Sequence, residues 1–550
     1  MIAQDVQAEN GGSINHSLDQ DNSGSGSGSG SIRPNALHEA NIFHSSFFGG
    51  PLPLAAAAAA AAAANDNIHS SSSSSPLSNR KPKNERLCLG GHRETIFGLS
   101  FSPDGVYFAT ASQDSTIGIW STKSHRLVMT LKEGMDVKFE CLRVAWSMGR
   151  GSNGSAGMNE KYLLASAGAD GIARLWSANI PATADANDNN DGELQWRCVG
   201  MLDHYLFEKE DRNCSHAQKE EEDGDEREED DESDRPQIYA LQFIPGNERS
   251  GSSTNALRLV TSTNDCIYLW DIHAKDDGVG GDDGINLRKF NLHTLIQFSH
   301  LNDDTNYNIN TFGGERNPDN ALYVFDASYC NANDWIGVAL SDGTCRVLSP
   351  CNATDAFDDN GVDKGSSSYQ ERCVLGLPPG YFGNNQGGGH LTALSWDASG
   401  TRLATCLASG RVVLWSIHAV KNGMDGDVLL QPSCMSILEG GHDAGRTLFG
   451  AKYCGSSNQD LLLTWGVDGK VCLWDSYSIG EVCSPLCTLI SHSKYPIYAL
   501  DVTAGGKDSV EQGNQVLHMA IGGGADGGFF GVPVYLYDIH SVFEPLTHTC

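Results

Sequence analysis

The sequence predicts an all-β protein built from a repeated unit. From Arg86 onward, short strand-like runs alternate with turns rich in Gly, Asp and Asn, and no stretch keeps a helical periodicity. Segments of this region also resemble one another, and most of them end in a Trp. A small unit of this kind cannot bury its apolar face alone, so we expect the copies to pack against one another in one domain.

The recurring unit is a pair of strands that closes on a large apolar residue. The run YFATASQDSTIGIW at 107–120 recurs as YLLASAGADGIARLW at 162–176. Five further copies end at Trp270, Leu348, Trp415, Trp474 and Tyr537. Another short strand precedes most copies, at 96–101, 141–146, 238–243, 391–396, 448–453 and 497–502. The chain therefore holds seven units, each with several strands.

The order of polar residues in these units resembles the WD-repeat family over about residues 86–540. A His precedes several units, a Ser or Thr and an Asp lie within them, and a Trp closes them. The resemblance implies a single seven-bladed β-propeller at 85–543. Successive closing residues are further apart than the roughly 40–45 residues of a typical repeat, so we expect long inter-strand insertions.

In this family the His, Ser or Thr, Asp and Trp of one repeat form a hydrogen-bonded chain that holds the blade together. A buried Trp N–H needs a partner, and an Asp fixes the His tautomer. The resemblance assigns to blade one His92, Ser112 (or Thr110), Asp114 and Trp120, and to blade six His442, Thr464, Asp468 and Trp474. It assigns to the other blades Asp170, Trp176, Asp265, Trp270, Trp415 and His492. These residue types also form catalytic triads, but here they repeat around the ring, so we expect no catalytic residue and no enzyme.

Some units depart from the pattern. The fourth unit has neither the His nor the Trp, and the fifth has Ser409 where Asp is expected. His204 is a candidate for the His of unit three, separated from its strand by an insertion. The run RLCLGGH at 86–92 resembles the last strand of a repeat, so we expect it to complete the final blade and remove an open sheet edge. Residues 542–550 are the alternative for that place.

The second residue of each inner strand is often aromatic. In this family the position lies near the mouth of the central channel, so the resemblance implies a collar of rings at that mouth. Such a collar would bind a long cationic side chain through cation–π contacts of about 0.5–2 kcal/mol. The rings would equally plug the channel or pack between blades, and both interpretations remain open. The collar residues are Phe97, Leu142, Tyr239, Thr392, Phe449 and Tyr498.

Three segments differ from the repeats in composition. Residues 1–84 contain Gly/Ser, Ala and Ser runs, which predict a disordered tail because they cannot bury enough apolar surface to fold. Residues 544–550 form a short C-terminal tail. An insertion at about 205–235 is strongly acidic, which predicts a disordered, solvated loop or an arm that attracts a basic partner.

The composition narrows the function. A formal net charge of −32 disfavours direct binding of nucleic acids or anionic membranes. The 16 Cys include no C-x-x-C pair, so we expect reduced thiols, a cytoplasmic or nuclear location, and no metal or cofactor. We find no signal peptide and no membrane span.

Together these features predict a non-enzymatic scaffold or adaptor that binds other proteins, with basic partners favoured, as a subunit of a complex. Two alternatives are a substrate receptor of a cullin-type ubiquitin ligase and a phosphoinositide-binding propeller. The first often carries Trp-Asp-x-Arg after a blade, which is absent here, and the second needs a paired Arg motif, which is also absent.

Overall fold

The computed structural model describes sixteen stretches of the chain, all within one compact unit that spans Ser73–Gly383 and Gly388–Cys550. The expected N-terminal tail lies outside the described residues except for 83 and 84, and the C-terminal tail and the acidic run 208–234 lie outside them entirely. The described stretches are 83–132, 139–148, 160–179, 195–207, 235–244, 257–274, 288–298, 322–350, 369–376, 390–422, 427–454, 461–477, 480–491, 495–504, 517–524 and 532–539.

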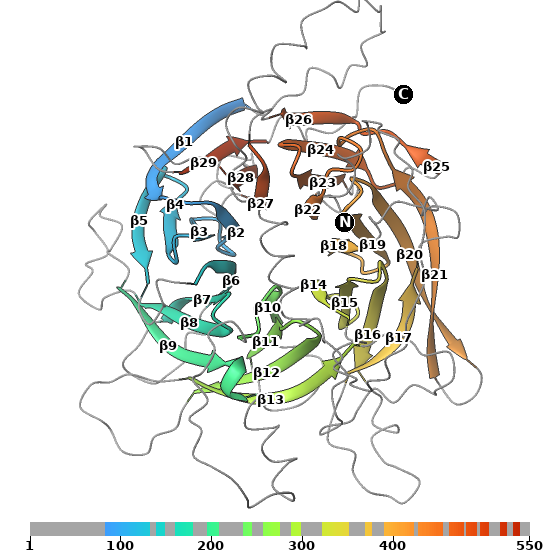
Figure 1. Ribbon diagram of the computed structural model, residues 1–550, viewed down its shortest axis with the longest axis horizontal. Coiled ribbons are helices and arrows are strands. Elements are labelled where there is room, and N and C mark those ends of the chain that lie inside the picture. Colours follow the sequence, from blue (N-terminus) through green and yellow to red (C-terminus); the bar gives the residue numbers. More distant parts are fainter. Residues whose placement is uncertain are drawn as a thin grey trace, which may run out of the picture. The chain divides into compact units, whose positions relative to one another are not determined.

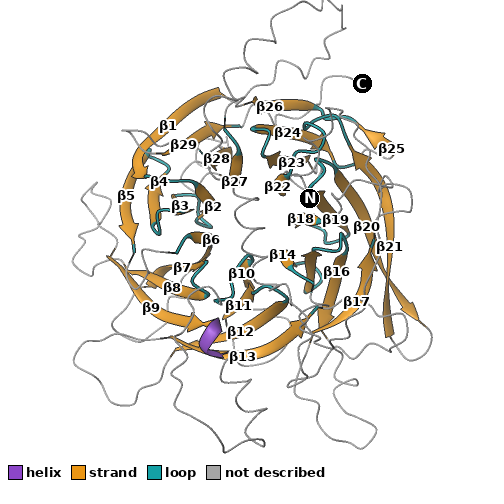
Figure 2. Ribbon diagram, in the orientation of Figure 1, coloured by secondary structure: helices purple, strands orange, loops and turns teal. Residues whose placement is uncertain are grey.

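The described residues form seven antiparallel sheets arranged as the blades of a ring (Figure 1). The first strand of each blade contacts the first strand of the next, and the contact between β27 and β2 closes the ring. Strands make up almost all of the regular structure, and one helical turn at 204–207 stands out in Figure 2. The predicted seven-bladed β-propeller is therefore confirmed.

Blades one to three take up the first half of the chain. Blade one contains β2 (Ile96–Phe101), β3 (Tyr107–Ser112), β4 (Ile117–Ser121) and β5 (Arg126–Leu131). Blade two contains β6 (Cys141–Met148), β7 (Glu160–Gly168), β8 (Ile172–Asn179) and β9 (Gln195–Asp203). Blade three contains β10 (Leu241–Ile244), β11 (Leu257–Ser262), β12 (Cys266–Ala274) and β13 (Arg288–Gln297).

Blades four to six follow in order. Blade four contains β14 (Val324–Cys330), β15 (Trp335–Leu340), β16 (Cys345–Pro350) and β17 (Tyr369–Leu375). Blade five contains β18 (Leu391–Trp396), β19 (Arg402–Leu407), β20 (Val412–Asn422) and β21 (Asp427–Leu438). Blade six contains β22 (Leu448–Cys454), β23 (Leu461–Gly466), β24 (Lys470–Asp475) and β26 (Cys487–Ser491). A further strand, β25 (Gly480–Cys483), pairs in parallel with β21 as a fifth strand of blade five.

Blade seven joins the two ends of the described chain. Its first three strands are β27 (Ile497–Ala504), β28 (Leu517–Gly523) and β29 (Val532–Asp538), and its fourth is β1 (Lys83–His92). Leu87 pairs with Tyr535, and His92 pairs with Val532. This confirms that the strand at 86–92 completes the last blade, so the open edge of β29 is removed.

The core lies between neighbouring blades. The seven buried clusters consist mostly of side chains from two adjacent sheets, as where Tyr107 and Ile117 of blade one meet Val144 and Trp146 of blade two. Such packing buries both faces of every sheet, which explains why the second and third strands of a blade are nearly continuous apolar runs.

Blade four is an ordinary blade despite its faint sequence pattern. Its closing residue Leu348 is fully buried and pairs with Ile336, as expected for the fourth unit. Its inner strand, β14, was not found in the sequence because VFDASYC mixes polar and apolar residues. The acidic insertion also begins later than expected, since residues 205–207 belong to the helical turn.

Candidate functional site

Blade one holds a hydrogen-bonded chain of four side chains, which we call a staple. The indole N–H of Trp120 donates to Oγ1 of Thr110 at 2.8 Å. The same oxygen lies 2.6 Å from Nε2 of His92, and Nδ1 of His92 lies 3.2 Å from the Asp114 carboxylate. Thr110 therefore takes the place for which Ser112 was the first choice. Ser112 instead donates to the carbonyl of Glu94.

Blade six repeats the staple with closely similar distances. Trp474 donates to Oγ1 of Thr464 at 2.7 Å, and Nε2 of His442 lies 2.7 Å from the same oxygen. Nδ1 of His442 lies 3.0 Å from the Asp468 carboxylate. Because the carboxylate can only accept, this arrangement places the proton on Nδ1 and leaves Nε2 as an acceptor for the Thr464 hydroxyl.

The glycine before each of these histidines has a steric reason. A Cβ on Gly91 would overlap the Trp120 ring, and a Cβ on Gly441 would lie 2.7 Å from the Trp474 ring. The backbone passes directly over the indole at both places. The Gly-His pair is therefore part of the staple geometry.

Blades two, three and five hold shorter chains. Trp176 donates to Ser166, Trp270 to Thr261 and Trp415 to Thr405, at 2.9, 2.9 and 3.0 Å. His204 reaches Thr261 at 2.7 Å, so it is the His of blade three.

Two other predicted staple residues lie elsewhere. Asp170 pairs with Arg174 at 2.7 Å, and Asp265 accepts from Gln297, so neither contacts a His as the sequence predicted. The reason is that no described His lies beside the Trp of blade two, and His204 directs its second nitrogen to the Gly171 carbonyl. The predicted staple residue His492 lies outside the described residues.

The His of each staple lowers the pKa of its Asp. Burial alone would raise the pKa of Asp114, but the hydrogen bond and the charge of His92 outweigh it and lower the pKa to about 2. The pKa of Asp468 is also lowered, against the effect of burial, by His442. Both carboxylates are structural groups of their blades.

The channel mouth is the end of the ring where the inner strands begin. In six of the seven blades, the turn between the second and third strands is bonded to the residue just before the inner strand. A backbone N–H of the turn donates to the carbonyl of that residue, as Gly524 does to Pro496. One residue later the strand register shifts, which leaves an extra residue near the mouth. The sequence prediction named these extra residues in five blades and Tyr239 in blade three.

The collar residues differ in exposure. Phe97, Leu142 and Thr392 are buried, whereas Tyr239, Phe449 and Tyr498 are partly exposed. The rings of blades six, seven and one pack in a row, since Tyr498 lies 4.6 Å from Phe449 and 5.6 Å from Phe97 between ring centroids. In this half the contacts match the interpretation that the rings pack between blades, with the outer faces of Phe449 and Tyr498 still accessible.

The sequence prediction missed one collar residue of the mouth. Phe325 occupies the collar position of blade four, and its ring lies 5.3 Å from that of His390. His390 directly precedes its inner strand, which is too close for a staple, and burial lowers its pKa. The register of β14 was needed to find Phe325, although the Phe after a Val is visible in the sequence.

The mouth also contains charged side chains next to the collar. Asp326 accepts backbone N–H groups from Leu394 and Ala327, each at 3.0 Å, while burial raises its pKa to about 6 despite the charge of Arg143. Arg143 donates to the Phe97 and Leu142 carbonyls and makes no direct ion pair with Asp326. Further along the inner strands, Lys452 pairs with Asp501, and its side chain is 43% exposed.

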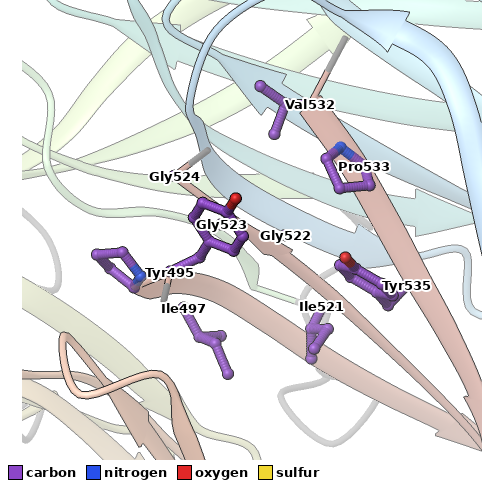
Figure 3. A pocket seen from close by; sticks show the side chains of 10 residues that line it. Tyr495, Ile497, Ile521, Gly522, Gly523, Gly524, Val532, Pro533 and Tyr535 are labelled. Carbon is purple, nitrogen blue, oxygen red and sulfur yellow. The ribbon is translucent and has the colours of Figure 1, made fainter. Parts of the chain in front are cut away.

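A shallow pocket opens on blade seven beside the mouth (Figure 3). Tyr495 lies on one side of it and Tyr535 on the other. Its lining comes from the start of β27, the end of β28 and the start of β29, namely Tyr495, Pro496, Ile497, Ile521, Gly522, Gly523, Gly524, Val532, Pro533 and Tyr535.

Both ends of the acidic insertion are anchored near the mouth. Phe207, the last described residue before it, packs on Trp270, and Arg235 just after it donates to the carbonyl of Asp170 at 3.4 Å. Asp170 lies at the mouth end of blade two, between β7 and β8. The insertion therefore leaves and re-enters the fold on the same side as the collar.

Other kinds of site are absent from the described part of the chain. Among these residues, no cluster of three or more His, Cys, Asp or Glu side chains could hold a metal ion. No helix within the described stretches is long and apolar enough to cross a bilayer. Burial raises the pKa of the Cys454 and Cys472 thiols to about 12, which makes them unreactive.

The fold and the staples define a class of protein, the repeat propellers whose blades are closed by a His–Thr–Trp chain. The family WD40, described as "WD domain, G-beta repeat", matches residues 83–121 and 383–416. The first match covers the staple of blade one, and the second covers the inner strands of blade five. Together with the seven blades, these matches place the chain in the WD-repeat β-propeller family.

Curated relatives share only parts of the chain. A probable cytosolic iron-sulfur protein assembly protein 1 from Chaetomium globosum is 33% identical over 132 residues, 21% of this chain and 26% of that protein. WD repeat-containing protein 1 of Mus musculus is 27% identical over 127 residues, 23% of this chain and 19% of that protein. Apoptotic protease-activating factor 1 of Mus musculus is 44% identical over 52 residues, 9% and 4% of the two chains. The matched region thus covers about a quarter or less of each relative's length.

Proposed function

We propose that this protein is a non-enzymatic scaffold or adaptor that binds a protein partner at the channel mouth, as a subunit of a cytoplasmic or nuclear complex. The observation behind it is the partly exposed group of Tyr239, Phe325, Phe449 and Tyr498 around the mouth. Large aromatic side chains that hold a fixed place and remain accessible are typical anchors of protein interfaces.

A basic partner is the chemistry that the charges favour. The chain carries a net charge of −32, and its acidic insertion is tethered on the mouth side by residues up to Phe207 and from Arg235. Long-range attraction of this kind accelerates association and weakens with salt. Asp326 adds a carboxylate beside the aromatic collar, where the ammonium or guanidinium group of a partner would find both a counter-charge and a ring face.

A substrate receptor of a cullin-type ubiquitin ligase is the second candidate. A receptor is itself an adaptor, so the propeller and its mouth suit both. No Trp-Asp-x-Arg follows any blade, which makes the general scaffold the better supported function. The phosphoinositide-binding propeller has less support, because the chain has no Arg-Arg pair to hold headgroup phosphates.

The test is affinity purification of the tagged full chain from cells that express it, with quantitative mass spectrometry. Wild type is compared with Tyr239→Ala/Tyr498→Ala and with a deletion of 208–234. Tyr477→Ala is the matched control, since Tyr477 is 53% exposed and follows β24 at the opposite end of the ring. Thermal melting of each variant shows that the propeller remains folded.

We expect a partner set enriched in basic proteins that is lost in the double variant and retained with Tyr477→Ala. Loss with the deletion alone would place the interaction in the acidic insertion. A cullin adaptor among the partners would favour the receptor function. A partner set unchanged in both the double variant and the deletion would contradict binding at the mouth.

A further inference from the structure

Blade seven has a pocket where blades one and six have a staple. The register makes the comparison direct: Ile521 pairs with Leu500 and Tyr535, as Thr464 pairs with Ala451 and Cys472. Ile521 therefore stands where blades one and six place the bridging threonine. It has no hydroxyl group to join a His to the closing residue.

The walls of the pocket are set by close backbone packing. A Cβ on Gly523 would overlap the carbonyl of Pro496, and a Cβ on Gly522 would lie 2.6 Å from Ile96 of blade one. Any larger residue would have to displace a neighbouring blade or loop. The glycines thus allow the backbone of the pocket wall to pack directly against its neighbours.

The lining selects an uncharged occupant. None of the ten lining residues carries a charge, and Ile497, Ile521 and Val532 are buried. A charged group placed here would lose its water without gaining a counter-ion. The rings of Tyr495 and Tyr535, together with Pro496 and Pro533, offer the flat apolar surfaces that bind the rings of an extended proline-rich segment.

The pocket is continuous with the collar. A Cβ on Gly524 would lie 2.9 Å from Cε2 of Tyr498, so the lining residue Gly524 packs directly against this collar ring. Tyr495, 45% exposed, stands at the rim where the two surfaces meet. A segment seated in the pocket would therefore extend directly over Tyr498 and Phe449 into the channel mouth.

We propose that the blade-seven pocket binds an uncharged, proline-containing extended segment of the protein partner. This proposal deepens the proposed function and rests on it. The pocket would hold an apolar segment of the same partner whose cationic groups bind near Asp326 at the mouth. The pre-formed extended shape of a proline-rich segment lowers the conformational entropy lost on binding.

The experiment measures fluorescence anisotropy of a fluorescein-labelled peptide, APPLPPLPA, titrated with the purified full chain. Two further probes are AGGLGGLGA, which lacks proline, and APPKPPKPA, which carries charge. The protein variants are Tyr495→Ala and Pro533→Glu, both at the rim, where truncation or charge leaves the buried walls unchanged. Tyr477→Ala is again the control for loss of an exposed ring.

We expect saturable binding of APPLPPLPA that is at least about tenfold weaker for Tyr495→Ala and for Pro533→Glu, and within about twofold of wild type for Tyr477→Ala. The Gly and Lys probes should bind at least about tenfold more weakly. Equal binding of the Pro and Gly probes, or no binding of any probe, would overturn the proposed ligand class. Binding that is lost only in Tyr239→Ala/Tyr498→Ala would overturn the pocket while leaving the proposed function intact.

Discussion

Blades six and seven are neighbours whose strands are held together by different interactions. Blade six closes through its staple, in which Thr464 joins His442 to Trp474. Blade seven has Ile521 and Tyr537 at the corresponding places, and its outer strand comes from the other end of the chain. Both blades pack on one shared apolar cluster, which includes Trp465 and Ile521.

This difference shows that the staple is one of two ways to hold a blade. A polar chain fixes His and Trp in one arrangement, and removing one member is costly because it leaves a buried polar group without a partner. Apolar packing and a borrowed strand tolerate substitution and leave room for a pocket. Blade seven, whose described residues lack the polar chain, is the blade on which the pocket opens.

The largest expected effect is the loss of the borrowed strand. Deleting residues 1–89 removes the pairing of Leu87 with Tyr535 and leaves β29 as an open edge. We expect a melting temperature lower by more than about 10 °C and a tendency to aggregate. Deleting residues 1–80 is the control and should leave melting unchanged. Equal melting of the two truncations, measured by calorimetry, would show that blade seven does not need β1.

The next effect distinguishes the two blades directly. Thr464→Val leaves the buried Trp474 N–H and one ring nitrogen of His442 without a partner, and should cost about 2–4 kcal/mol of unfolding free energy. Ile521→Val, at the matching place, should cost only about 0.5–1.5 kcal/mol. Urea unfolding measures both. Similar costs would mean that the staple contributes no more than ordinary packing.

Low pH should destabilise a stapled blade before it destabilises blade seven. The folded pKa of Asp114, about 2, lies below its ordinary value of 3.8, so its stabilising effect is complete above about pH 4 and is lost as the pH falls through 2. The shift corresponds to roughly 2 kcal/mol. Hydrogen exchange between pH 5 and 2.5, corrected for intrinsic rates, should show β4 losing protection before β28. Parallel loss in both strands would contradict this order, and Asp114→Asn should abolish the difference.

The stability contributed by Asp326 at the mouth should depend on pH with the opposite sign, falling as the pH rises. Because its folded pKa is raised to about 6, ionising it costs stability as the pH rises from 4 through 6. Asp326→Asn should therefore gain stability relative to wild type by roughly 1–2 kcal/mol between pH 4.5 and 7.5. Urea unfolding at both pH values gives the difference. A gap that does not change with pH would show that Asp326 is not buried as an ionised group.

The smallest expected effect lies on the rim of blade six. Lys470 pairs with Asp443 at 2.7 Å, but Asp443 is largely exposed. Asp443→Asn should change the unfolding free energy by less than about 0.5 kcal/mol, and salt should remove even that. Urea unfolding at low and high ionic strength checks this. A cost near that of Thr464→Val would show that surface charge contributes as much as the buried chain.

The sequence predicted most of the fold because apolar strands and turn residues are local signals. Seven units, the closing Trp residues and the strand at 86–92 followed from patterns that need no knowledge of distant contacts. Blade four's inner strand was missed because the Asp326 side chain accepts a hydrogen bond from Leu394 of blade five, which a local pattern cannot show. The choice between Ser112 and Thr110 also depended on which hydroxyl faces the indole.

The sequence by itself determined the repeat, the number of blades and the residue types of the staple, because each blade is a local unit whose strands follow one another along the chain. Only the tertiary structure decided which polar residues meet, as with His204 and Thr261, since these contacts join segments separated by insertions. It alone showed that the collar continues into a pocket at Tyr495. Surfaces of that kind arise where several blades come together, and no single repeat contains them.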